Sequence, residues 1–190
     1  MTTFYICRHG ESENNKRRRL MGWLDTPLTD EGVQNAASSA AKLKGIKFDK
    51  IVSSDLGRAF TTAYLISREL GYTDEIKRSR ELREVNYGDL ANMPYAAYPE
   101  KSQAENTNFA PPNGESLAQM QQRVLAYAHK LSADNADKTI LLVGHHGTIN
   151  AVHASFTGED MGTADANEKT HDFVAQFTVN DGSITSFTEL

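Results

Sequence analysis

Two short segments of this sequence place histidine and arginine directly after apolar runs. Residues 8–10 read RHG after the run FYIC, and residues 144–147 read GHHG after the run TILLV. A third apolar run ends at Ser54 and is followed by Arg58. Imidazole can act as a nucleophile or a proton carrier near neutral pH, and guanidinium groups offer a planar fork of donors to phosphoryl oxygens. These residue types in this pattern indicate phosphoryl chemistry.

The elements that must position these residues alternate along the chain. Apolar spacing, N-cap residues and glycine stops predict strands that are each followed by a helix. This alternation predicts an α/β fold with a mostly parallel central sheet and helices on both faces. Ligands of such sheets bind outside the carboxyl ends of the strands, so we expect the two histidines and two arginines at one edge. The expected strands lie at residues 3–8, 48–54 and 138–147 and in a hairpin at 171–190 that turns at 180–182; the expected helices lie at 28–45, 55–71, 114–131 and about 148–156.

The overall composition is that of an ordinary globular protein. The 190 residues are 39% hydrophobic and 24% charged, which fits one domain over residues 1–190. Residues 89–114 lack a long apolar period, and we expect them to form an insertion or lid. The formal net charge of −5 argues against nucleic-acid binding driven by bulk charge, so a bound anion must be held by a local cluster.

The location of the protein in the cell is predicted from two further features. Cys7 is the single cysteine, which excludes an internal disulfide and suits a reducing compartment. The first ten residues lack the basic and apolar regions of a signal peptide, and no run approaches the roughly 20 apolar residues of a membrane span. We therefore expect a cytoplasmic protein without membrane contact.

Six motifs in a fixed order carry a resemblance to a known family. They are RHGESENN, PLTDEG, SSDLGRAFTTA, LREVNYG, GESLAQMQQRV and VGHHGTI. In order and spacing they resemble the histidine phosphatase superfamily, in its phosphoglycerate mutase-like branch, from Phe4 to about Ala151. The resemblance implies a phosphoglycerate mutase-like fold and a small phosphorylated substrate.

The resemblance also implies a role for each residue of the predicted cluster. His9 is then the nucleophile that becomes a phosphohistidine, which splits one displacement into two. Arg8, Arg58 and His145 hold the phosphoryl oxygens and spread the growing charge. Asn15 adds a neutral donor to the same phosphate, and the chemistry requires no metal or other cofactor.

A carboxyl group must protonate the leaving oxygen, and in this family it follows a strand. The segment LREVNYG matches that position and nominates Glu84 as general acid in the first step and as general base toward water in the second. Without the resemblance, Glu84 reads as a surface carboxylate paired with a neighbouring arginine. Glu11 is expected to form hydrogen bonds at a helix N-terminus, and His129 and His171 are expected to be structural.

Three further features concern the surroundings of the phosphate. Residues 16–18 are basic in an acidic protein, and they either form a solvated loop or bind a second anionic group of the substrate. Arg19 matches a basic position of the family and is expected to bind substrate. His146 stands where relatives often carry glycine, and it either contacts substrate or shapes the turn. Histidines at 145, 146 and 153 form a poor tripod for a metal ion, so no metal site is predicted.

Two activities and one non-catalytic alternative fit the resemblance. Mutases of this family cover the site with a large insertion, whereas this chain has only residues 89–113 there. The short insertion favours an open site and the hydrolysis of phosphomonoesters, with mutase-type phosphotransfer as the alternative. A non-catalytic phosphoryl-binding protein is the third possibility, against which the presence of His9 and Glu84 argues. A sugar phosphate, a phosphoglycerate, a nucleoside monophosphate, α-ribazole phosphate and a phosphoprotein all remain open as substrates, and the sequence predicts no oligomeric state.

Overall fold

The computed structural model describes residues 1–101 and 103–190. Within these residues a six-stranded sheet has the order β3-β2-β4-β1-β5-β6. The first four strands in this order are parallel to one another, and β5 and β6 run antiparallel to their neighbours. The expected mixed α/β architecture with a mostly parallel core is therefore confirmed. The strands are β1 (Thr2–Arg8), β2 (Lys50–Ser54), β3 (Lys77–Ser79), β4 (Thr139–Gly144), β5 (Val174–Asn180) and β6 (Ser183–Glu189).

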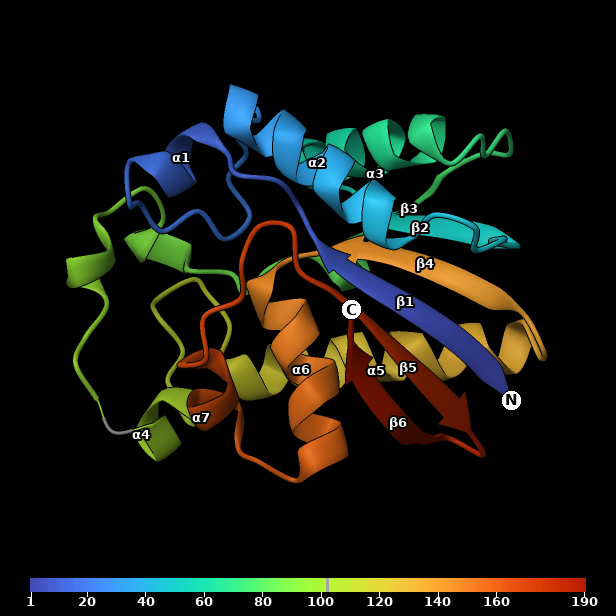
Figure 1. Cartoon of the computed structure of the whole chain (residues 1–190). Coiled ribbons are helices and arrows are strands. Elements are labelled where there is room, and N and C mark those ends of the chain that lie inside the picture. The colour runs from blue at the N-terminus through green and yellow to red at the C-terminus, as the bar shows by residue number, and fades with distance from the viewer. Residues whose placement is uncertain (102) are drawn as a thin grey trace.

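Helices cover both faces of the sheet (Figure 1). The helices α2 and α3 pack on one face through small side chains such as Ala36 and Ala63, and α5 and α6 pack on the other through larger ones such as Met120. Side chains of β1 alternate accordingly, with Cys7 on the first face and Ile6 on the second. The α-helices are α1 (Glu13–Lys16), α2 (Asp30–Lys42), α3 (Gly57–Glu69), α4 (Gln103–Asn108), α5 (Leu117–Asp134), α6 (His146–Thr157) and α7 (Met161–Asp165); the 3₁₀ turns are η1 (Arg80–Leu82), η2 (Gly88–Leu90) and η3 (Tyr95–Ala97).

Most helix boundaries follow the sequence signals, but α6 begins earlier than expected. Thr29 caps α2 by accepting the Gly32 N–H at 3.0 Å, as predicted. The predicted start of α6 was about Thr148, whereas the helix begins at His146. The reason is that the Thr148 hydroxyl accepts the backbone N–H of His145 at 2.7 Å and so starts the helix two residues earlier. His146 and Gly147 therefore belong to the first turn of a helix.

Strand register brings the two histidine segments together. Arg8 of β1 pairs with Gly144 of β4, so the residues that follow, His9 and His145, leave the sheet side by side. The His9 N–H donates to the Gly144 carbonyl at 3.0 Å, which extends the ladder by one more bond. The carboxyl edge of the parallel sheet therefore carries both histidines, as the sequence predicts.

The loop after β1 lies against the N-terminus of α2 at a distance that only glycines permit. A Cβ atom on Gly10 would lie 2.1 Å from the Gly32 carbonyl oxygen, and one on Gly32 would lie 2.0 Å from the Glu11 carbonyl oxygen. The Glu11 side chain accepts the Thr29 hydroxyl at 2.7 Å, which is the hydrogen-bonding role expected for it. Helix α2 thus fixes the backbone on which His9 stands.

Residues 89–114, expected as an insertion or lid, are anchored at two places. Residues 92–95 pair with residues 18–20: the Leu20 N–H donates to the Met93 carbonyl at 2.9 Å and the Asn92 N–H to the Leu20 carbonyl at 2.7 Å. At the other end, the Thr107 hydroxyl of α4 donates to the Asp160 carboxylate at 2.9 Å, at the start of α7. The segment therefore joins the loop after β1 to the region after α6. Among the described residues, no helix is long and apolar enough to cross a membrane.

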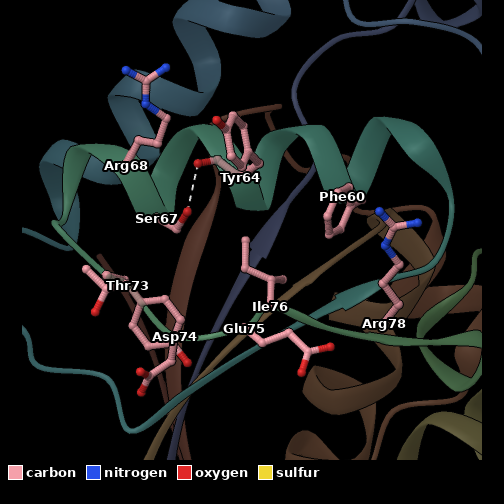
Figure 2. A pocket seen from close by; sticks show the side chains of 10 residues that line it. Phe60, Tyr64, Ser67, Arg68, Thr73, Asp74, Glu75, Ile76 and Arg78 are labelled. Atoms are coloured by element: carbon pink, nitrogen blue, oxygen red, sulfur yellow. Dashed lines mark hydrogen bonds between the residues drawn. The ribbon is translucent and has the colours of Figure 1, made fainter.

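A surface depression of about 630 Å³ lies between α3 and the segment that leads into β3. Figure 2 shows its lining, with Arg68 on the helix and Asp74, Glu75 and Arg78 on the opposite segment. The Arg78 guanidinium lies over the Phe60 ring, 3.5 Å from its centroid. The residues with predicted chemistry do not line this depression, so it is separate from the predicted site.

Candidate active site

His9 is held at the end of β1 as a neutral imidazole whose lone pair is on Nε2. Its side chain is 3% exposed, its Nδ1 lies 2.7 Å from the Gly10 carbonyl oxygen, and its Nε2 lies 3.3 Å from Arg58 Nε. A carbonyl only accepts and a guanidinium only donates, so Nδ1 carries the proton and Nε2 keeps its lone pair. Burial and the nearby Arg58 charge hold the pKa of His9 well below its usual range. Such an imidazole can attack an electrophile through Nε2.

Arg58 is the buried cation next to His9. It stands in the first turn of α3 and is 1% exposed. Its Nη1 donates to the Leu24 carbonyl at 2.7 Å and its Nη2 to the Gly22 carbonyl at 2.8 Å. Asp25 accepts the Arg58 backbone N–H at 3.2 Å and lies 3.4 Å from Nη1, so one carboxylate both caps the helix and pairs with the side chain. The orientation of the guanidinium is therefore fixed from three sides.

His145 and Arg8 each present a buried N–H group that has no acceptor among the described residues. His145 is 0% exposed, and its Nδ1 lies 3.3 Å from Arg58 Nη2, which must donate to it. Burial and then Arg58 hold the pKa of His145 well below its usual range, so its proton lies on Nε2, the nitrogen without a partner. Arg8 donates through Nη1 to the Lys169 carbonyl, while its Nε has no partner within residues 1–101 and 103–190. A buried N–H group without an acceptor costs about 1–3 kcal/mol of folding free energy. Two such groups therefore favour the binding of an anion next to Arg8 and His145.

Glu84 reaches the same region from the segment after η1. Its Oε1 accepts the Val85 N–H at 2.9 Å, and its Oε2 accepts the Gly147 N–H at 3.2 Å at the N-terminus of α6. A Cβ on Gly147 would lie 2.2 Å from Oε1, so this approach of the carboxyl group requires glycine. The earlier start of α6 thus places a backbone donor, two residues beyond His145, on the Glu84 carboxyl group.

A partly buried ion pair holds the backbone that carries Glu84. The Arg123 guanidinium donates to the carbonyls of Glu81, Arg83 and Glu84 at 2.8–2.9 Å. The same group pairs with Glu115, with contacts of 2.5 and 3.1 Å. Three carbonyls between residues 81 and 84 are therefore fixed by one guanidinium group from α5.

Two of the predicted substrate-binding residues lie between β1 and α2, Asn15 in α1 and Arg19 in the loop after it. Asn15 uses its Oδ1 to accept the Ser12 N–H at 3.1 Å and the Ser12 hydroxyl at 2.7 Å, which leaves its amide N–H groups for another acceptor. Arg19 donates through Nη1 to the Asn92 carbonyl at 2.5 Å, so its guanidinium contacts the 89–114 segment. The structure brings His9, Arg58 and His145 into direct contact, whereas it places Arg19 on the insertion.

The basic run before Arg19 is exposed, as a solvated loop would be. Arg17 pairs with Glu13 at 3.3 Å on the surface of α1. Arg18 lies 5.9 Å from the Tyr95 ring centroid. The role of residues 16–18 in binding a second anion stays a prediction.

His146 connects α6 to α7. Its Nε2 lies 3.0 Å from the Asp165 carbonyl oxygen, 3.5 Å from the Asp165 Oδ1 and 2.9 Å from Asn150 Nδ2. The sequence predicts that His146 either contacts substrate or shapes the turn. The contact with Asp165 is a link between two helices, which neither of these predictions includes. Asp165 was not predicted at all, because α7 is only five residues long and carries no apolar period.

His171 contacts the backbone of His9, which is compatible with the structural role that the sequence predicts for it. Its Nδ1 lies 3.0 Å from the His9 carbonyl oxygen, and the two rings are 5.5 Å apart. Burial, and then the Arg8 charge, lower the pKa of His171 to about 4. The residue stands just before β5, and only the pairing of β5 with β1 brings it to His9. No signal in the sequence specifies that pairing.

We expect His171 to make the fold less stable as the pH falls. In the unfolded chain this residue has its ordinary pKa of about 6.5, whereas in the folded chain its pKa is lowered to about 4. Stability is therefore unaffected by this group above pH 6.5 and decreases between pH 6.5 and 4, by at most about 1.4 kcal/mol per pH unit. Urea unfolding of wild type and His171→Asn at several pH values measures this term. The variant should lose less stability than wild type over that window, with His129→Asn on α5 controlling for the loss of one histidine; parallel curves for wild type and His171→Asn would contradict the assignment.

Known proteins resemble this chain over most of its length. A sequence model of the histidine phosphatase superfamily (branch 1) matches residues 4–185. The 2,3-bisphosphoglycerate-dependent phosphoglycerate mutase of Bartonella tribocorum is 33% identical over 168 residues, which cover 82% of each chain. The glucosyl-3-phosphoglycerate phosphatase of Mycolicibacterium vanbaalenii is 35% identical over 166 residues, which cover 80% of this chain and 73% of the relative.

The fold of the chain is also similar to that of a solved structure. Bacillus stearothermophilus YhfR superposes with a TM-score of 0.87 at 26% identity, covering 97% of this chain and 95% of that one. The relatives include both phosphatases and mutases, and catalysis through a phosphohistidine is typical of them. The chain therefore belongs to the histidine phosphatase superfamily and is an enzyme of its phosphatase and phosphotransferase type.

Proposed function

We propose that this protein hydrolyses phosphomonoesters of small metabolites through a phosphohistidine on His9. The observation that carries the proposal is a pair of buried donors, Arg8 Nε and His145 Nε2, that have no acceptor in the part of the chain that the structure describes. They accompany the lone pair of His9 Nε2, which accepts only the 3.3 Å hydrogen bond from Arg58. A phosphoryl group supplies oxygens for the donors and a phosphorus atom for the lone pair. Asn15 supports the proposal because its Oδ1 accepts from Ser12 and its amide N–H groups can donate to a phosphoryl oxygen. Two guanidinium groups and neutral imidazole donors supply the charge stabilisation, so the proposed chemistry uses no metal ion.

The first step transfers the phosphoryl group to the protein. His9 Nε2 attacks phosphorus, the bond from phosphorus to the ester oxygen breaks, and the leaving oxygen takes a proton from Glu84. Negative charge on the phosphoryl oxygens is met by Arg8, Arg58 and His145. The Nδ1–H of His9 keeps its hydrogen bond to the Gly10 carbonyl oxygen, and this bond stabilises the positive charge that the imidazole gains.

The second step releases the phosphoryl group to water. The Glu84 carboxylate takes a proton from a water molecule, whose oxygen attacks phosphorus while the bond from phosphorus to His9 Nε2 breaks. Inorganic phosphate leaves, and both side chains return to their starting protonation states. The alternation of one carboxyl group between acid and base requires that it stay in place, which the Gly147 N–H and the Arg123 fork support.

The size of the insertion favours hydrolysis over phosphotransfer. The insertion after the Glu84 segment is limited to residues 89–114. The helical elements along it, η2, η3 and α4, are all short. Mutase-type transfer to a second position of the same substrate is the alternative, because several mutases are among the relatives at 33–35% identity. The two activities differ in whether water reaches the phosphohistidine.

Product analysis separates these two activities. We expect release of inorganic phosphate from glycerol 3-phosphate, undiminished by a chelator such as EDTA. With 3-phosphoglycerate and a trace of 2,3-bisphosphoglycerate, isomerisation to 2-phosphoglycerate should be slower than phosphate release from the preferred ester. Isomerisation that outpaces all phosphate release would make the protein a mutase, and loss of activity with EDTA would contradict the proposed chemistry.

Replacement of Glu84 by glutamine should matter only when the leaving group is poor. An alkoxide needs a proton to depart, so Glu84→Gln should slow the first step with an alkyl phosphate by about 10²- to 10⁴-fold. An activated aryl phosphate leaves as a stable phenolate, and its first step should hardly change. Pre-steady-state burst rates on both esters give the comparison, with Asp181→Asn in the β5–β6 turn as a charge-matched control. Equal losses on both esters would assign Glu84 to binding and leave the acid unidentified.

A further inference from the structure

The loop between α1 and α2 contacts two groups that the proposed chemistry uses, the Arg58 guanidinium and the backbone of Glu84. The carbonyls of Gly22 and Leu24 accept Arg58 Nη2 and Nη1 at 2.8 and 2.7 Å. The residue between them is Trp23, which is partly buried and donates its indole N–H to the Glu84 carbonyl at 2.9 Å. Three consecutive residues therefore connect the cation proposed to hold the phosphoryl group to the segment that carries the proposed acid.

The Glu84 carbonyl is held from two sides. It accepts the Trp23 indole from the loop and Arg123 Nη2 from α5 at 2.8 Å, so both of its lone pairs are used. The loop also packs on the residues that follow. A Cβ on Gly22 would lie 2.7 Å from the Val85 carbonyl oxygen, and its φ of +51° also favours glycine. The loop and α5 thus hold the acid segment between them.

A second connection joins the same two groups through Arg83. Arg83 directly precedes Glu84 and pairs with Asp55 through two hydrogen bonds of 2.6 Å. Asp55 follows β2 directly and stands three residues before Arg58. The Arg83 guanidinium lies over the Trp23 ring, 5.0 Å from its centroid, a distance at which a cation and an indole attract each other. The contacts form a closed ring, with Trp23 as the link on one side and the pair of Arg83 and Asp55 on the other.

The acid segment needs such links because it has no regular structure of its own. Residues 83–87 lie in no helix or strand, so no ladder of backbone hydrogen bonds fixes them. A general acid must stay within hydrogen-bond reach of the leaving oxygen, and a displacement of about 1 Å can cost about 10²-fold in rate. The indole N–H is the only polar group of the Trp23 side chain, and its acceptor is Glu84.

We propose that Trp23 is a positioning residue, which sets the place of the Glu84 carboxyl group relative to the phosphoryl group on Arg58. This inference rests on the proposed function and adds a residue on which proton transfer depends. The indole binds the carbonyl of Glu84 and not its carboxyl group, so its effect passes through the backbone. Loss of the indole should therefore slow those steps in which the proton of Glu84 is needed.

Two esters with different leaving groups test the inference. Trp23→Phe keeps an aromatic ring and removes the indole N–H. With glycerol 3-phosphate, whose alkoxide needs a proton, we expect the first step to slow about tenfold. With p-nitrophenyl phosphate, which leaves as a stable phenolate, the first step should change by less than about twofold. Pre-steady-state burst rates measure both, and a merely structural role for Trp23 would lower them equally.

A second variant breaks the ring of contacts on its other side. Asp55→Asn keeps the shape of the side chain and weakens its pair with Arg83, so it should slow the first step with glycerol 3-phosphate more than with p-nitrophenyl phosphate. Tyr64→Phe is the matched control, because it removes one polar group from an aromatic ring on the exposed side of α3. It should leave both rates unchanged. Thermal unfolding of each variant shows whether the fold is intact.

A double variant shows whether Trp23 acts through Glu84. In Glu84→Gln no acid remains to be positioned, so adding Trp23→Phe should change the rate with glycerol 3-phosphate by less than about twofold. Three results for Trp23→Phe would overturn the inference: no loss with glycerol 3-phosphate, equal losses on both esters, or a loss that multiplies with that of Glu84→Gln. A burst from wild type would leave the proposed function standing in each case. Absence of a wild-type burst with both esters would contradict the proposed function, and the inference would fall with it.

Discussion

The buried guanidinium of Arg58 is the constraint on which the rest of the site depends. An unpaired charge at 1% exposure would be expensive, and the fold offsets that cost with two carbonyls and the Asp25 carboxylate. Arg58 also donates to His9 Nε2 and to His145 Nδ1. Because a guanidinium cannot accept a hydrogen bond, both of these imidazole nitrogens must act as acceptors. The lone pair on His9 and the unpartnered N–H of His145 are direct consequences of this one group.

Backbone geometry, rather than side-chain charge, places the proposed acid. The N-terminus of α6 offers the Gly147 N–H to Glu84, and glycine at that position is what lets the carboxyl group approach. On the other side of the segment, Arg123 holds three carbonyls and is itself held by Glu115. The acid therefore depends on two helices, α5 and α6, which pack on the same face of the sheet. A change in either helix would move Glu84 relative to His9.

The sequence predicts the positions of those site residues that directly follow regular strands, His9 and His145. The apolar runs before His9 and His145 read as buried parallel strands, and their common edge follows from the α/β pattern, so these two residues could be placed without a structure. Arg58 could be placed because it follows the end of β2 by four residues and stands in the first turn of the next helix. Asp25 and His171 could not be placed, because they reach the site from irregular segments outside the helices and strands. His171 further depends on β5 pairing with β1, a choice of neighbour that alternating patterns do not encode.

The covalent intermediate on His9 is the central claim, and intact-mass measurement tests it most directly. Wild type is mixed with a phosphomonoester and quenched within one turnover in alkaline denaturant, because the phosphorus–nitrogen bond of phosphohistidine is labile in acid. The account predicts a mass increase of one phosphoryl group, located to His9 by peptide mapping and absent in His9→Ala. An adduct on another residue, or a His9→Ala variant that turns over within tenfold of wild type, would contradict it.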